Sequence, residues 1–164
     1  MIRILPITPH DFQTIVGWNA DKDADYLCQW AGRKEYQYPL TAAQVADRCN
    51  AVNARIFMAF EQEKAIGSIE LDDIDLIRGT ARICRFILSD QARGRGLGRR
   101  VLWELIQIAF DEMGLNRLTL RVYCFNVGAI RCYQKCGFLV SEFHQDENPY
   151  WNAYTMELAK HTQQ

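Results

Sequence analysis

Three glycines alternate with other residues in the segment Arg93-Gly94-Arg95-Gly96-Leu97-Gly98, which lies between a predicted strand and a predicted helix. A helix start exposes unpaired backbone N–H groups and the positive end of the helix macrodipole, and glycine lets a ligand approach the backbone closely. A tight strand-to-helix turn would use the same glycines. These residues alone therefore predict either a phosphate-binding loop or a structural turn.

Basic side chains surround this segment. Arg93, Arg95, Arg99 and Arg100 stand at the start of the predicted helix, where the macrodipole disfavours cations unless an anion offsets them. Such a local conflict is typical of functional sites and favours the phosphate-binding interpretation. Two familiar phosphate loops fit poorly, because no Lys-Ser or Lys-Thr pair follows Gly98 and the glycine spacing differs from that of dinucleotide-binding folds.

Hydrophobic periodicity and capping residues predict the remaining elements. In chain order we expect a strand at 3–6, a helix from Thr8 to about Trp18, a short helical piece at 26–30, a helix opened by Thr41, strands at 55–60, 65–71 and 81–88, a helix over 98–113, a strand at 118–123, a helix from Asn126 to about Lys135, and strands from Phe138 and over 150–158. This order predicts an α/β (α+β) fold with one mixed, mainly antiparallel central sheet flanked by helices.

Composition limits the classes of function. The 164 residues are 49% hydrophobic and 24% charged, which suits a single domain over 1–164. A formal net charge of −1 argues against a chain-wide footprint for nucleic acid. No apolar run approaches the roughly 20 residues of a membrane span, and the first residues lack a secretory-signal pattern. We expect a cytoplasmic protein that binds neither nucleic acid nor membrane, with its cysteines as reduced thiols.

Two motifs together resemble the signature of a known enzyme family. The first leads from the strand at 86–88 into Arg93-x-x-Gly96-x-Gly98, and the second reads Asn126-Val-Gly-Ala129-Ile130-Arg-Cys-Tyr133-Gln-Lys-Cys-Gly137-Phe138. In residue types and spacing they resemble the GCN5-related N-acetyltransferases, the GNAT family, over residues 81–138. The one departure is Asp90, where many members have proline, and it concerns only the geometry of the turn.

The resemblance implies a fold of the GNAT type and transfer of an acetyl group from acetyl-CoA to a primary amine by direct attack. Backbone N–H groups of the glycine segment would receive the pyrophosphate, and the strand at 86–88 would pair with the pantetheine arm like an added strand. The implied cofactor-binding core covers about 81–138. Its implied binding residues are Phe86, Ile87, Leu88, Arg93, Gly94, Arg95, Gly96, Leu97, Gly98, Arg99, Asn126 and Tyr133.

Tyr133 and Asn126 each have a structural and a functional interpretation. From residue chemistry, Tyr133 is a half-buried helix aromatic near Ala129 and Ile130, and Asn126 is a helix N-cap. The resemblance implies that Tyr133 is catalytic and donates a proton to the departing thiolate of coenzyme A. It also implies that Asn126 contacts the cofactor arm, which is compatible with capping.

A general base is expected because an amine with a pKa near ~10 is protonated at neutral pH and cannot attack a thioester. The resemblance implies Glu70 as this catalytic group, acting directly or through water. The alternation of Ser68 and Glu70 with Ile69 and Leu71 is equally compatible with a solvent-facing Glu70. Asp72 is the fallback base.

The cysteines are expected to take no part in the chemistry. Cys124 and Cys132 would allow a route through an acetylated thiol, but the scattered histidines fit no Cys–His motif. Cys132 and Cys136 are four residues apart without the further ligands of a metal site, so we expect no metal.

The sequence leaves the amine acceptor open: a polyamine, an amino sugar, an amino acid or a protein amine. Carboxylates that would attract a cationic amine, or form a solvated face, are Asp21, Asp23, Asp25, Glu70, Asp72, Asp73 and Asp75. Aromatic residues that would wall an acceptor pocket, or pack in the core, are Trp30, Tyr36, Tyr38 and Trp151.

The alternative function is a non-catalytic acyl-CoA-binding or regulatory module, against which Tyr133 and Glu70 argue. Homodimers are common in the family, but no interface motif decides the oligomeric state.

Overall fold

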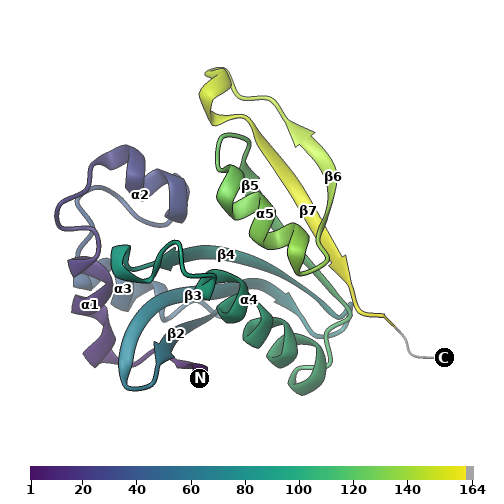
Figure 1. Ribbon diagram of the computed structural model, residues 1–164, viewed down its shortest axis with the longest axis horizontal. Helices are drawn as coiled ribbons and strands as arrows, with labels where there is room; N and C mark the ends of the chain where they lie inside the picture. Colours follow the sequence, from purple (N-terminus) through teal and green to yellow (C-terminus); the bar gives the residue numbers. More distant parts are fainter. Residues whose placement is uncertain (162–164) are drawn as a thin grey trace.

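One seven-stranded sheet, in the order β1-β2-β3-β4-β5-β7-β6, runs through the computed structural model, which describes residues 1–161 (Figure 1). The strands are β1 (Ile2–Pro6), β2 (Arg55–Glu61), β3 (Lys64–Asp75), β4 (Thr80–Leu88), β5 (Arg117–Tyr123), β6 (Leu139–His144) and β7 (Ala153–Ala159). Among the described residues, β4 and β5 pair in parallel and all other neighbours pair antiparallel. The predicted mixed, mainly antiparallel sheet is confirmed.

Helices cover both faces of this sheet. They are α1 (Phe12–Gly17), α2 (Ala24–Ala31), α3 (Ala42–Arg48), α4 (Leu97–Gln107) and α5 (Val127–Lys135). One core contains Leu102 of α4 and Tyr133 of α5, packed with Leu118 of β5. A second core contains Ile15 of α1 and Val45 of α3. Figure 1 shows α4 and α5 in front of the sheet.

The predicted capping residues start the early helices. Thr8 forms a reciprocal capping box with Asp11, and the Thr41 hydroxyl accepts a hydrogen bond from the Gln44 backbone N–H. Asp23, which was not predicted as a cap, accepts from the Tyr26 backbone N–H and starts α2. Side-chain acceptors at these positions satisfy N–H groups that a helix start leaves without partners.

Several predicted elements differ from the structure at their ends; β3, for example, continues to Asp75 instead of ending at 71. The first helix opens with a 3₁₀ turn, Pro9–Asp11, before α1. The α-helical part of α4 ends at Gln107 and continues as a π-helical turn, Ile108–Glu112. The last strand begins at Ala153 instead of 150, because Asn148 caps a 3₁₀ turn at Pro149–Trp151. Local hydrogen bonding at these ends does not follow from hydrophobic periodicity.

β4 and β5 pair only over the first part of their length. Their register runs from Thr80 to Ile83, and neither Leu88 nor Tyr123, the last residues of the two strands, has a partner in it. A bulge in β4 places Arg85 at a φ of 47°. Figure 1 shows β5 diverging from β4, with α2 near the open end. The parallel pair therefore separates beyond Ile83 of β4 and Leu120 of β5.

Within residues 1–161, no helix combines the length and the apolar character that crossing a membrane requires.

Candidate active site

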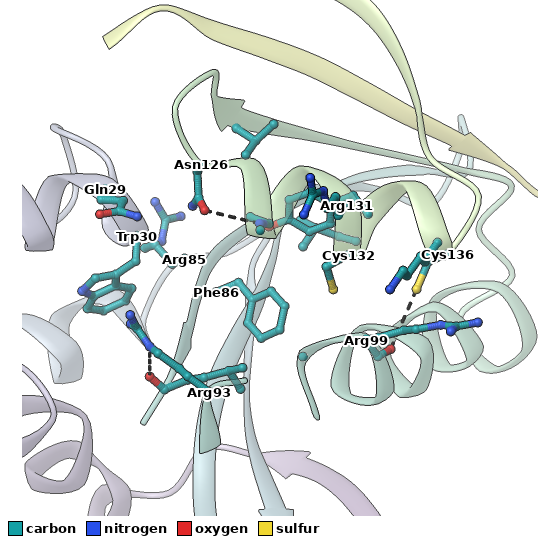
Figure 2. Close-up of a pocket in the computed structure, with 18 of the residues that line it drawn as sticks. Gln29, Trp30, Arg85, Phe86, Arg93, Arg99, Asn126, Arg131, Cys132 and Cys136 are labelled. Atoms are coloured by element: carbon teal, nitrogen blue, oxygen red, sulfur yellow. Dashed lines mark hydrogen bonds between the residues drawn. The ribbon is translucent and has the colours of Figure 1, made fainter. Parts of the chain in front are cut away.

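A cavity of about 1060 Å³ lies where β4 and β5 diverge. Residues of α2, β4, the glycine segment, α4, β5 and α5 line it. Figure 2 shows Phe86 of β4 between α5 and α4, with Trp30 and Gln29 of α2 on the other side of Arg85. The cavity therefore extends from the start of α4 to the helix α2.

The glycine segment forms the part of the cavity at the start of α4. Gly94 and Gly96 have φ values of 73° and 74°, a conformation that side chains with a Cβ rarely adopt. Gly96 is the N-cap of α4, and no side chain caps the helix there. An added Cβ at Gly98 would lie 3.3 Å from the Leu88 side chain. The uncapped N–H groups and this close packing form a cradle that suits a phosphate group.

Most residues of the predicted binding set line this cavity. They are Phe86, Leu88, Arg93, Gly94, Gly96, Gly98, Arg99, Asn126 and Tyr133. Ile87 and Leu97 are buried in the core instead, and Arg95 donates to Glu61 over 2.9 and 3.0 Å. Strand and helix periodicity turns the side chains of Ile87 and Leu97 away from the cavity, and Arg95, in the turn before α4, is held by Glu61 instead.

Tyr133 combines burial with access to the cavity. Its side chain is 8% exposed, and its ring packs edge-on against Phe138 at a centroid distance of 6.0 Å. Burial raises the pKa of its hydroxyl above the ordinary value, so this group stays protonated at neutral pH. Asn126 lines the cavity and also caps α5, where its Oδ1 accepts from the Ala129 backbone N–H at 3.3 Å. The expected capping role of Asn126 is confirmed.

Glu70 is not solvent-facing, and that interpretation of the strand pattern is wrong. Its side chain is 1% exposed, lies outside the lining of the cavity and accepts hydrogen bonds from two arginines. Arg48 donates to Oε1 at 2.6 and 2.8 Å, and Arg85 donates to both carboxylate oxygens at 2.7 and 2.9 Å. With both oxygens held in this way, the geometry does not support Glu70 as the group that takes a proton from an amine.

The fallback base, Asp72, belongs to the same cluster. Its Oδ2 lies 2.9, 3.0 and 3.1 Å from nitrogens of Arg48, Arg82 and Arg85. Burial opposes ionisation of Asp72, but the Asp73 backbone N–H and the arginine charges outweigh it, so the pKa of this carboxyl is below its ordinary value. A lowered pKa makes Asp72 a weaker proton acceptor.

The helix α2 contributes cavity residues that the sequence motifs did not indicate. Tyr26, Gln29 and Trp30 line the cavity. Arg93 donates to the Tyr26 hydroxyl, and its guanidinium lies 5.2 Å from the centre of the Tyr26 ring. Lys22 pairs with Asp90 at 2.8 Å. These contacts join segments nearly 70 residues apart, so no local pattern in the sequence could have revealed them.

The four aromatic residues proposed for an acceptor pocket have different surroundings. Trp30 lines the cavity. Tyr36 is buried, and the centre of its ring lies 5.9 Å from that of Trp30. Tyr38 is exposed. Trp151 packs against Tyr123 at 4.9 Å, at the open end of β5.

The thiols near the cavity are poor nucleophiles. All six cysteines are free, and burial raises the pKa of Cys132 to about 11 and that of Cys84 to about 12. Neither is ionised at neutral pH, and thiolate is the reactive form. Among the described residues, Glu70, Asp72 and Cys84 lie close enough to share a metal ion, but arginines already hold both carboxylates.

A sequence profile of the Acetyltransferase (GNAT) family matches residues 20–138. The chain belongs to this family. The match includes α2, β4, the glycine segment and α5, which are the elements that surround the cavity. The family resemblance carried by the two motifs is confirmed.

The chain is similar to several curated acetyltransferases. The spermidine N(1)-acetyltransferase of Vibrio cholerae is 30% identical over 99 residues, which is 60% of this chain and 56% of that protein. Acetyltransferase PseH of Campylobacter jejuni is 28% identical over 56% of this chain and 55% of its own length. The chain thus spans about half the length of these curated relatives.

Solved structures extend the similarity of fold to nearly the whole chain. The spermidine N-acetyltransferase from V. cholerae in complex with CoA and spermine superposes with a TM-score of 0.80 at 18% identity, covering 96% of this chain and 95% of that one. A dodecameric structure of spermidine N-acetyltransferase from the same organism gives a TM-score of 0.75 at 19% identity, covering 96% of this chain and 93% of that one. The GNAT fold is therefore confirmed over nearly the whole chain.

Proposed function

We propose that the protein is an acetyl-CoA-dependent N-acetyltransferase that acts on a primary amine by direct attack. The observation that carries this proposal is the position of Tyr133 in a cavity that also contains the uncapped start of α4. The first feature suits proton donation to a leaving thiolate, and the second suits a pyrophosphate. Membership of the GNAT family supports the same conclusion.

The residues present fit acetyl-CoA, which supplies the thioester of the reaction. Backbone N–H groups of Gly96 and its neighbours would hold the pyrophosphate, with Arg93 and Arg99 beside them. Beyond the bulge at Arg85, β4 has no β5 partner within the described residues, which leaves its backbone groups free to pair with an extended amide chain. These features support the binding set predicted for the cofactor.

Tyr133 is the proposed general acid. When the neutral amine nitrogen bonds to the thioester carbonyl carbon, the carbon–sulfur bond breaks and the Tyr133 hydroxyl donates its proton to the departing sulfur. The resulting phenolate regains a proton from solvent, and the new amide nitrogen loses one. No enzyme thiol is acylated, in keeping with the raised pKa of Cys132.

The amine proton leaves without a carboxylate base in our proposal. Glu70 and Asp72 are held by arginines, and of the carboxylates predicted near the acceptor none lines the cavity. Water in the cavity then takes up the proton before attack, and the fraction of neutral amine sets the pH dependence of the rate.

Ligand-induced stabilisation tests the cofactor. Acetyl-CoA at 100 times its dissociation constant should raise the free energy of unfolding by roughly 2.7 kcal/mol, seen as a shift of several degrees in thermal unfolding. ATP and NAD are the phosphate-bearing controls. Mass spectrometry of amine mixtures incubated with acetyl-CoA then tests transfer, and binding without any acetylated product would favour the non-catalytic acyl-CoA-binding module.

We further propose that residues 1–164 act as one domain and that the protein acts in the cytoplasm as a homodimer. Free cysteines suit a reducing compartment. The edge strand β6 carries Leu139 and Phe143, which are 74% and 57% exposed, and would be covered by a second copy. Light scattering with Phe143→Lys tests this: the wild type should be dimeric and the variant monomeric.

A further inference from the structure

The cavity has two sides, which the alternation of side chains on β5 distinguishes. Leu120 and Val122 pack into the core that contains residues of α4 and α5. Arg121 and Tyr123 alternate with them and therefore point to the opposite face of the sheet. The Tyr123 hydroxyl lies 3.6 Å from Cys28 of α2. The half of the cavity between α2 and this face of β5 lies across the sheet from α4, so we assign it to the acceptor.

No carboxylate lines this acceptor half among the residues that the structure describes. Its charged lining residues are Arg85 and Arg121. The nearest acids are already paired: Glu70 and Asp72 with the arginine cluster, and Asp146 with Arg33 at 2.9 Å. A polycationic acceptor would thus bring its additional ammonium groups to a wall without a free anion.

Arg121 differs from Arg85 in making no direct ion pair, although after Arg33 its charge contributes to lowering the pKa of Asp146. Arg85 is bound to Glu70 and Asp72, whereas Arg121 is exposed and makes no hydrogen bond or ion pair within residues 1–161. The cavity as a whole is basic. In the part of the chain that the structure describes, one carboxylate, Glu104, lines it together with Arg85, Arg93, Arg99, Arg100, Arg121, Arg131 and Lys135. The cations on the glycine segment, α4 and α5 are placed for the cofactor phosphates, which leaves Arg121 available to the acceptor.

We propose that the acceptor is a primary amine that also carries an anionic group, a carboxylate or a phosphate, and that Arg121 binds this anion. The inference rests on the proposed acetyltransferase function and names its substrate class. Guanidinium groups bind both anions through paired hydrogen bonds. An acceptor held in this way spans from Arg121 on β5 towards Tyr133 on α5, with Trp30 and Tyr123 as apolar walls.

Matched pairs of amines test the proposal through acetyl transfer. Glucosamine 6-phosphate is compared with glucosamine, and alanine with alaninamide, which lacks the carboxylate; spermidine serves as the polycation. Mass spectrometry of the acetylated products gives kcat/KM for each amine. We expect the anionic member of at least one pair to exceed its neutral partner by about tenfold or more, the usual effect of one charge-assisted contact. The two pairs distinguish a phosphate from a carboxylate.

Arg121→Gln tests the residue itself. The anionic-to-neutral ratio of kcat/KM should fall about tenfold or more in this variant, because the charge that recognises the anion is gone. Arg117→Gln is the matched control: Arg117 lies on the same face of β5, outside the cavity, and its ion pair with Glu157 is exposed. A ratio that is unchanged in Arg121→Gln would overturn the proposal, as would a higher kcat/KM for spermidine than for every anionic amine.

Binding measurements separate failure of this inference from failure of the proposed function. Calorimetric titration of the CoA-saturated protein with the same amines requires no turnover. Tighter binding of an anionic amine than of its neutral partner, lost in Arg121→Gln, supports the inference even if no product forms, and the absence of product then counts against catalysis alone. Tighter binding of spermidine, or equal binding of both members of each pair, overturns it.

Discussion

The guanidinium of Arg85 donates two hydrogen bonds to the carboxylate of Glu70, over 2.7 and 2.9 Å, and both side chains are buried. This pair connects the bulge in β4 to β3, and Arg48 of α3 binds the same carboxylate. The bulge lies where β4 separates from β5 and the cavity begins. The arginine–carboxylate cluster therefore holds one wall of the cavity in place.

Glu70→Gln should destabilise the fold without removing a base. The substitution removes the carboxylate that buried Arg85 and partly buried Arg48 share and leaves them Asp72 as their remaining anion. Breaking a buried pair typically costs about 3–5 kcal/mol, which is the upper bound for this substitution. Urea denaturation measures this loss. Glu61→Gln is the control, because Glu61 pairs with Arg95 at the surface and its loss should cost at most about 1 kcal/mol. A large fall in kcat with unchanged stability would instead support the catalytic-base assignment of Glu70.

The pH profile of kcat/KM should rise with pH and show no decrease below pH 9. Between pH 6 and 9, kcat/KM should rise up to about tenfold per pH unit, because the neutral amine increases until pH reaches its pKa near ~10. Burial raises the pKa of Tyr133, so its protonated, proton-donating form persists to higher pH than for an exposed tyrosine. Initial rates at saturating acetyl-CoA measure this profile. A descending limb below pH 9 would contradict the assignment of Tyr133 as the acid.

Gly96→Ala should weaken acetyl-CoA binding. An added methyl at Gly96 would meet no atom within 4 Å, so the cost comes from the backbone, whose φ of 74° disfavours a residue with a Cβ by roughly 1–2 kcal/mol. The strained cap would displace the N–H groups at the start of α4, and calorimetric titration should show an increase in Kd of about tenfold. Gly17→Ala, in a helix with open space around it, should leave Kd unchanged.

The sequence predicted those parts of the site that depend on local chemistry. The glycine segment, the Asn126 cap and the position of Tyr133 on α5 all follow from residues within one strand-to-helix unit. The starts of two early helical segments could also be predicted from the sequence, because Thr8 and Thr41 cap backbone groups close to them in the chain.

Features that depend on distant contacts were missed or misread. The surroundings of Glu70 are set by Arg48, 22 residues earlier, and by Arg85, 15 residues later. Alternation along β3 correctly put Glu70 on the face opposite to Leu71, but it could not tell that arginines and α3 cover that face. The contribution of α2 to the cavity was invisible for the same reason, since Tyr26 meets Arg93 only through the fold.

Tyr133→Phe should lower kcat while leaving the binding of acetyl-CoA nearly unchanged. The ring continues to pack against Phe138, and only the hydroxyl that donates the proton is lost. Removal of a general acid typically costs about 10²–10⁴-fold in rate. Steady-state kinetics and titration with acetyl-CoA measure the two effects separately. Tyr154→Phe is the control, because Tyr154 of β7 packs against Phe143 of β6 and does not line the cavity. Near-normal turnover of Tyr133→Phe would exclude Tyr133 as the group that donates a proton to the departing thiolate.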